Sequence, residues 1–103
     1  MKYLANAFSL SMLPSNTEGL RISPISLEEV ITFLPGSVSC VGHADTAAVF
    51  SHILGSEIAT NRVSVSLVSG DTMIVGQYSG PRLPEGTAFL PAGAEIKWFL
   101  VTI

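Results

Sequence analysis

The apolar residues of this chain fall into short runs that are interrupted by serine, glycine and proline. No run approaches the roughly 18 to 20 apolar residues that a membrane-spanning helix needs, so the sequence predicts no transmembrane segment. Runs of this length suit β-strands and short helices that share one hydrophobic core. With 103 residues, the chain can build one such core but not two. We therefore predict a single domain over residues 1–103.

Five segments have the composition or the alternation of β-strands. The clearest is NRVSVSLV at residues 61–68, where valine and leucine alternate with polar residues, as in a strand with one buried face. Ser69-Gly70-Asp71 then predicts a turn that pairs this strand with residues 71–78 in a hairpin. The other predicted strands cover residues 2–8, 37–42 and 95–103.

Two segments carry the signals of helices. Ser26 followed three residues later by Glu29 is a possible capping box, and Pro35-Gly36 would stop the segment, so we predict a short helix from about residue 26 to 34. With a second helix after His43, these elements predict an α/β fold. We expect a mixed sheet of about five strands with flanking helices.

The second helix has the better-defined ends. From Thr46 onward the apolar residues recur at helical spacing, and Gly55 stands where a left-handed C-cap is expected. Asp45 is the predicted N-cap, because its carboxylate can accept hydrogen bonds from the free amides of the first turn. His43 would then lie just outside the mouth of this helix.

Composition narrows the classes of partner. Cys40 is the one cysteine, so no disulfide within the chain is possible, a structural zinc site is disfavoured, and a reducing cytoplasm is the expected location. A net charge of -3, from five Lys and Arg against eight Asp and Glu, argues against broad binding to long nucleic acids. Because 48% of the residues are hydrophobic and only 13% charged, we expect apolar surface to remain for a partner, with dimerisation its natural outlet.

His43 admits three interpretations. It can be a loop residue that hydrogen-bonds to the backbone. It can be a metal ligand, although the other histidine, His52, lies nine positions away, a spacing that is not typical of zinc sites. It can be a catalytic acid, because helix N-terminal amides favour a bound phosphate and an imidazole there can protonate a leaving oxygen.

Arg82 and Glu85 lie in a stretch rich in glycine and proline, residues 79–95, which predicts a structured loop. They can form a surface ion pair that contributes less than about 1 kcal/mol. Alternatively, the stiff loop pre-positions the guanidinium for a bidentate phosphate contact. Arg62 has the same two interpretations: an exposed residue at the start of a strand, or a second phosphate contact.

Four stretches, taken in order, resemble one protein family: LANAFSLSML near the start, GHADT before the second helix, GSEIATNRV after it, and PRLPEG near the end. They are similar to the viral and bacterial ring nucleases, whose viral members act as anti-CRISPR proteins against type III systems. The resemblance covers most of the chain and is weakest over residues 14–40. It depends on the order and spacing of the four stretches rather than on any one motif.

The resemblance implies a homodimer of α/β protomers whose interface binds cyclic tetra-adenylate, the second messenger of type III CRISPR immunity. It implies cleavage without metal or cofactor: a ribose 2'-hydroxyl attacks the adjacent phosphate, and the family histidine, matched by His43, protonates the departing 5'-oxygen. Linear di-adenylates with a 2',3'-cyclic phosphate result. The implied catalytic residues are His43, Arg82 and Glu85, and the implied substrate contacts are Asn6, Ser9, Ser11, Gly42, Arg62 and Arg82.

Four positions depart from the pattern of the viral members. This chain has Ala44-Asp45 where they carry Asp-Ser, Pro84 where they carry a second glutamate, and Ser11 where asparagine is common. The charge count nevertheless fits an anionic ring. Two copies of Arg62 and Arg82 would offer four guanidinium groups to the four phosphates, and a twofold dimer matches the symmetry of the ring.

Two other functions are compatible with the same residues. A non-catalytic dimer that sequesters the nucleotide, or that docks a protein through its apolar surface, would also explain the sparse catalytic equipment. A transcriptional or structural dimer is disfavoured because no basic helix is present.

Overall fold

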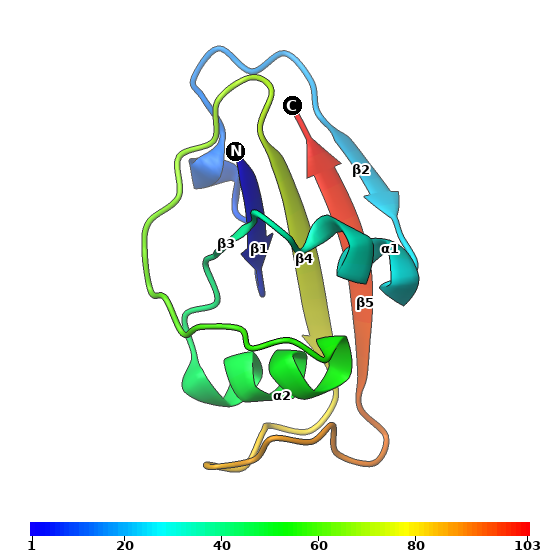
Figure 1. Cartoon of the computed structure of the whole chain (residues 1–103). Coiled ribbons are helices and arrows are strands. Elements are labelled where there is room, and N and C mark those ends of the chain that lie inside the picture. Colours follow the sequence, from blue (N-terminus) through cyan, green and yellow to red (C-terminus); the bar gives the residue numbers. More distant parts are fainter.

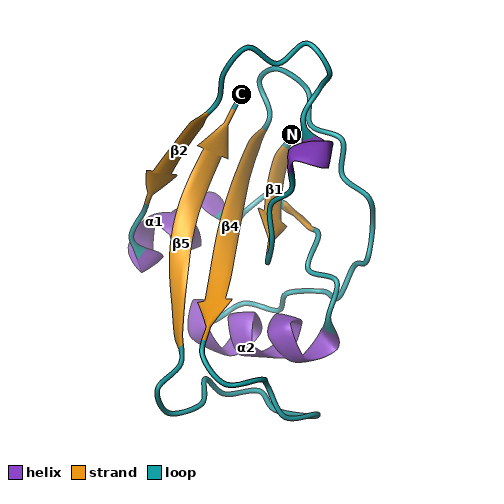
Figure 2. Cartoon of the chain, turned by 180° about the vertical axis from the view of Figure 1, so that it is seen from behind, coloured by secondary structure: helices purple, strands orange, loops and turns teal.

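The computed structural model describes all of residues 1–103 and contains one five-stranded sheet with both α-helices on one of its faces (Figures 1 and 2). The strands are β1 (Lys2–Ala5), β2 (Arg21–Pro24), β3 (Val38–Ser39), β4 (Thr72–Ser79) and β5 (Glu95–Thr102). The helices are α1 (Leu27–Phe33), α2 (Ala44–Leu54) and the short 3-10 helix η1 (Leu10–Met12). The predicted α/β fold with a mixed five-stranded sheet is confirmed.

The strand order β2-β5-β4-β1-β3 determines where a site can form. β1 runs parallel to both β3 and β4, whereas β5 runs antiparallel to β4 and β2. The carboxyl ends of β1, β3 and β4 therefore share one edge of the sheet, and α2 and the connection from β4 to β5 lie at this edge (Figure 1). In open α/β sheets this is the edge at which ligands bind.

The core beneath the helices is centred on Phe50 of α2. Its ring centroid lies 4.9 Å from that of Trp98 on β5. Gly76 of β4 lies against both rings: a Cβ atom there would be 2.6 Å from Phe50 Cζ and 2.6 Å from Trp98 Cζ3. Any side chain at this position would push the two rings away, so the close approach requires glycine. The buried cluster comprises Leu4, Val30, Val41, Ala47, Phe50, Leu54, Ile74 and Trp98.

The face without α-helices carries a second cluster, which consists of Ala5, Leu67, Met73, Val75 and Val101. Residues 61–68 pack against this cluster without joining the sheet, so the strand and the hairpin predicted there are wrong. The physical reason is that both edges of β4 are already paired, with β1 and β5. Leu67 belongs to the cluster and Val65 packs against it, while Ser64 and Ser66 are exposed. The alternation therefore reflects an extended segment packed on the sheet.

The turn after this segment is confirmed, and Asp71 stabilises it. The Asp71 amide donates to Val68 O at 3.0 Å, and the Val68 amide donates to Asp71 Oδ2 at 2.9 Å. The amino terminus of Met1 donates to Asp71 Oδ1 at 3.1 Å. The carboxyl group is only 5% exposed. The backbone hydrogen bond from Val68, and then the charge of the amino terminus, lower the pKa of Asp71 below its ordinary value.

β2 is a strand that the sequence analysis missed. It is short and mostly exposed, and it ends in Pro24, whose missing N–H is tolerated because β2 is an edge strand. The strands predicted at residues 2–8 and 37–42 are observed only as β1 and β3. The sheet therefore has the predicted number of strands, but Arg21–Pro24 is a strand of the sheet and residues 61–68 are not.

The helix predicted over residues 26–34 is confirmed as α1. Its capping box is complete, since the Glu29 amide donates to Ser26 Oγ and the Ser26 amide donates to Glu29 Oε1, both at 3.2 Å. The predicted end of α2 is also confirmed: Gly55 is the C-cap, with a left-handed φ of 69°. No helix in the structure has the length and hydropathy needed to cross a bilayer.

Candidate functional site

The connection from β4 to β5, residues 80–94, is a loop built from defined turns, as predicted. The Thr87 amide donates to Pro84 O, and the Ala94 amide donates to Pro91 O, each at 3.1 Å. Gly80, with a φ of 143°, closes the base of the loop: a Cβ atom there would lie 2.7 Å from Ala94 Cα. The loop therefore leaves the sheet and returns to it at one point.

The first residues of this loop are held against the end of β4. The hydroxyl of Tyr78 donates a hydrogen bond to Pro81 O, and the proline ring itself restricts the backbone. Arg82 follows directly. Its position is therefore restrained by the sheet, although its side chain is exposed.

At the mouth of α2 the N-cap is His43 and not Asp45 as predicted. His43 has extended backbone angles (φ -126°, ψ 131°), its carbonyl accepts from the Ala47 amide at 2.9 Å, and its side chain makes no capping hydrogen bond. Asp45 lies inside the first turn. Its Oδ1 accepts a hydrogen bond from the Gly86 amide of the loop at 3.1 Å. The carboxylate predicted to cap the helix binds the loop instead.

A cavity of about 860 Å³ lies between the mouth of α2 and this loop. Its walls are formed by the start of α2, by the end of β4 and by the first half of the loop. Its lining residues are His43, Asp45, Thr46, Tyr78, Arg82, Leu83, Pro84 and Glu85. His43 and Glu85 are 42 positions apart in the sequence, and the structure brings both of them together with Arg82 in this cavity.

The charges in this cavity are mixed. Arg82 is one cation, while Asp45 and Glu85 are two carboxylates. Arg82 and Glu85 form no hydrogen bond or ion pair, and both are exposed, so both are free to contact a ligand. No group of three or more His, Cys, Asp or Glu side chains is close enough together to hold a metal ion. The first-turn amides and Arg82 can bind an anion, and the His43 imidazole can exchange a proton with it.

Arg62 lies beside the cavity rather than in its lining. The preceding residue is tied to the loop after β3, because the Asn61 amide donates to Val41 O at 2.8 Å and Asn61 Nδ2 donates to Ser39 O at 2.7 Å. A Cβ atom on Gly42 would lie 3.5 Å from Arg62 Cγ. The Arg62 stem therefore packs against the residue that precedes His43.

Comparison with known proteins places this arrangement in a family. The model of the STIV B116-like family matches residues 2–97, which include every residue of the cavity. The chain belongs to the STIV B116-like family. B116 of Sulfolobus turreted icosahedral virus (STIV) has a similar structure, with a TM-score of 0.85 over 99% of this chain and 98% of B116. At 23% sequence identity, this similarity shows the shared fold.

A sequence relative of this STIV B116-like chain comes from Sulfolobus islandicus filamentous virus (isolate Iceland/Hveragerdi). It is Uncharacterized protein 26, which is 29% identical over 76 residues. The match covers 72% of this chain and 64% of that relative. The chain therefore spans less than two thirds of the length of the curated relative.

Of the six implied substrate contacts only Arg82 lines the cavity. Gly42 and Arg62 lie beside it, and the other three are Asn6, Ser9 and Ser11. Ser9 is the N-cap of η1 and its hydroxyl lies 3.0 Å from that of Ser11, so both serines stabilise a turn. Both views place η1 beside the N-terminus, at the opposite end of the sheet from α2 and the loop 80–94 (Figures 1 and 2). Asn6 directly follows β1 and does not line the cavity either. Their role in binding stays a prediction.

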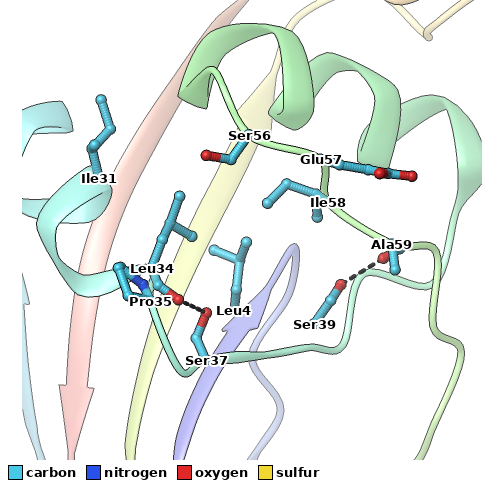
Figure 3. A pocket seen from close by; sticks show the side chains of 10 residues that line it. All are labelled: Leu4, Ile31, Leu34, Pro35, Ser37, Ser39, Ser56, Glu57, Ile58 and Ala59. Atoms are coloured by element: carbon cyan, nitrogen blue, oxygen red, sulfur yellow. Dashed lines mark hydrogen bonds between the residues drawn. The ribbon is translucent and has the colours of Figure 1, made fainter.

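A second, smaller cavity of about 550 Å³ lies between the end of α1 and residues 56–59 (Figure 3). Leu4, Leu34 and Ile58 form an apolar floor, and none of the residues implied for catalysis or binding lines it. The Ser39 hydroxyl donates to Ala59 O at 2.6 Å across one side. This bond secures the segment that leads to Arg62.

Three polar residues of the larger cavity had no predicted functional role: Asp45, Thr46 and Tyr78. Tyr78 was assigned to a predicted strand, and Thr46 to the start of a helix, without any functional interpretation. A signal for Tyr78 exists, because it is an aromatic residue with a hydroxyl at the end of a strand and immediately precedes the glycine-rich and proline-rich loop. Its contact with Pro81 links the strand to the residues that carry the charges.

Proposed function

We propose that this chain is a metal-independent ring nuclease that cleaves cyclic tetra-adenylate to linear di-adenylates ending in a 2',3'-cyclic phosphate. The observation that carries the proposal is the shared cavity of His43, Arg82 and Glu85 at the mouth of α2. The order of sequence stretches that resemble the ring nucleases supports the same function. The cytoplasm, where this second messenger is found, is the proposed location.

The proposed reaction is an internal transfer that needs no water in the first step. A ribose 2'-oxygen attacks the adjacent phosphorus, the bond from phosphorus to the 5'-oxygen breaks, and the departing oxygen receives a proton from His43. Arg82 binds the phosphate oxygens, since a guanidinium can form two parallel hydrogen bonds with them. Glu85, a carboxylate without a partner in the structure, is suited to accept the proton of the 2'-hydroxyl. Two such events open the ring into two halves.

We further propose that the active species is a homodimer. In one chain, two guanidinium groups lie in or beside the cavity, those of Arg82 and Arg62, whereas the ring has four phosphates. A second copy would add its own Arg62 and Arg82. The face without α-helices offers a surface for that contact, because Phe8, Ile22 and Phe99 line a shallow apolar groove there.

Incubation with labelled cyclic tetra-adenylate in EDTA tests the activity. Linear di-adenylate with a cyclic phosphate end is the expected product, and a ring that stays intact contradicts the proposal. Removal of one general acid slows a reaction by about 100- to 10,000-fold. His43→Ala should therefore bind the ring as the natural protein does and cleave it slower by that factor. A variant that cleaves at the normal rate would remove His43 from the mechanism.

One observation favours a second function, sequestration without cleavage. The His43 side chain forms no hydrogen bond in the structure, so no second group orients the imidazole in the way that catalytic histidines are commonly oriented. Tight binding of the ring without turnover, at every protein concentration, would support sequestration. Cleavage that scales with protein concentration would exclude it.

A further inference from the structure

One hydrogen bond joins the loop 80–94 to α2, and it is the bond from the Gly86 amide to Asp45 Oδ1 at 3.1 Å. The other hydrogen bonds of the loop connect it to itself or to β4. Gly86 belongs to the turn that contains Glu85, and this turn also follows Arg82 closely in the chain. Asp45 therefore contacts the part of the loop that carries Arg82 and Glu85, the two charged residues that the loop contributes to the cavity.

A second contact shows that the loop lies along α2. The ring of Phe89 lies edge-on to that of His52, with centroids 4.5 Å apart. Asp45 and His52 are seven residues apart and so face the same side of the helix, separated by about 10 Å along its axis. Gly86 and Phe89 are three residues apart, a span of at most about 11 Å when extended. The two contacts therefore fit one extended piece of loop laid against one side of α2.

We propose that Asp45 is a positioning residue: by holding the Glu85-Gly86 turn against the first turn of α2, it keeps Arg82 and Glu85 beside His43. This inference deepens the proposed function, and it depends on that function for the roles of Arg82, Glu85 and His43. The contact itself does not depend on it. Because the acceptor is a carboxylate, the bond to Gly86 is charge-assisted and stronger than a neutral one.

The same carboxylate has an unfavourable consequence for an anionic ligand. Asp45 lines the cavity in which a phosphodiester would bind, and two negative groups a few ångströms apart repel each other. Its acceptor oxygen and its charge therefore have opposite effects: the oxygen holds the loop, while the charge weakens binding of the ring. Two substitutions separate them, because Asp45→Asn keeps an acceptor oxygen and removes the charge, and Asp45→Ala removes both.

Amide hydrogen exchange of the free protein tests the contact without any ligand. In Asp45→Ala we expect the loop amides around Gly86 to exchange about tenfold faster, whereas in Asp45→Asn, which keeps a neutral acceptor, the increase should be smaller. Glu57→Ala, which removes an exposed carboxylate from the segment after α2, is the matched control and should change nothing in the loop. Unchanged exchange in Asp45→Ala, with α2 still protected, overturns the proposal.

Binding and cleavage of cyclic tetra-adenylate then test the consequence. Asp45→Asn should bind the ring a few-fold more tightly and lose less of the single-turnover rate than Asp45→Ala. Asp45→Ala should lose about tenfold or more in that rate, because Arg82 and Glu85 are no longer held. Equal single-turnover rates in both variants would overturn the positioning role. Should the natural protein leave the ring intact, the proposed activity fails, while the exchange measurement still decides whether Asp45 holds the loop.

Discussion

The middle of β4 and the loop that follows it are a few residues apart in the chain and differ in what holds them. Met73 and Ile74 are essentially inaccessible to solvent, and β4 has a hydrogen-bonded strand on each side. Arg82 and Glu85 are exposed, and a few turn bonds and one bond to α2 restrain their loop. Stability therefore resides in the sheet, whereas the groups available for chemistry lie on a restrained but exposed segment.

The same substitution, made on α2 where this helix covers the sheet and again in the loop, should break this comparison most clearly if it is wrong. Phe50→Ala removes a fully buried ring that contacts Trp98, and we expect the free energy of unfolding to fall by about 3–5 kcal/mol. Phe89→Ala removes a ring that is 62% exposed on the loop, and we expect a change within about 0.5 kcal/mol. Urea denaturation measures both. Similar losses in the two variants would contradict the division between sheet and loop.

A buried carboxylate at the other end of β4 should give an intermediate effect. Asp71→Asn weakens the bonds to the Met1 amine and the Val68 amide, and at neutral pH we expect a loss of about 1–3 kcal/mol in the free energy of unfolding.

This loss should depend on pH in a defined direction. Because the folded-state pKa of Asp71 is lowered, its contribution is present above the unfolded value of about 3.9 and disappears as the pH falls through the folded value. The natural protein and Asp71→Asn should therefore converge in stability as the pH falls from about 4 through the folded-state pKa of Asp71. Urea titrations at pH 7 and in acid measure the difference, and a gap that stays constant would contradict the assigned ion pair.

Substitutions of the two arginines should distinguish the lining of the cavity from the surface beside it. We expect their effects on binding to be smaller than the stability losses above. Arg82 lines the cavity and Arg62 packs beside it, against Gly42. We expect Arg82→Ala to weaken binding of cyclic tetra-adenylate about tenfold and Arg62→Ala to weaken it by less, because Arg62 does not line the cavity. Isothermal titration at fixed salt compares them. A larger loss from Arg62→Ala would place the ligand outside the cavity described here.

The features that were predicted correctly from the sequence depend on local signals. The capping box of Ser26 and Glu29 and the terminal Gly55 act within a few residues of the helices that they end. The strand β2 was missed because its partner is distant, with Arg21 opposite Thr102. Residues 61–68 were assigned wrongly because alternation reports which side chains are buried, and not whether the backbone has a free strand edge to pair with.

The candidate site also has a part that was predicted from local signals and a part that was not. His43, Arg82 and Glu85 were selected from short stretches, and the topology brings them into one cavity because β3 and β4 end at the same edge of the sheet. The contact of Asp45 with Gly86 was not predicted, because these residues are 41 positions apart. Local reasoning assigned the carboxylate to the nearest free amides, which are those of its own helix.

The most direct test of the central claim compares two rings in single-turnover cleavage by His43→Ala. One ring is natural cyclic tetra-adenylate, and in the other a sulfur atom replaces each bridging 5'-oxygen. A thiolate departs without needing a proton, so a general acid is no longer required. If His43 protonates the leaving oxygen, the variant should cleave the sulfur-containing ring at nearly the rate of the natural protein while remaining about 100- to 10,000-fold slower on the oxygen ring. An equal loss on both rings would contradict the account.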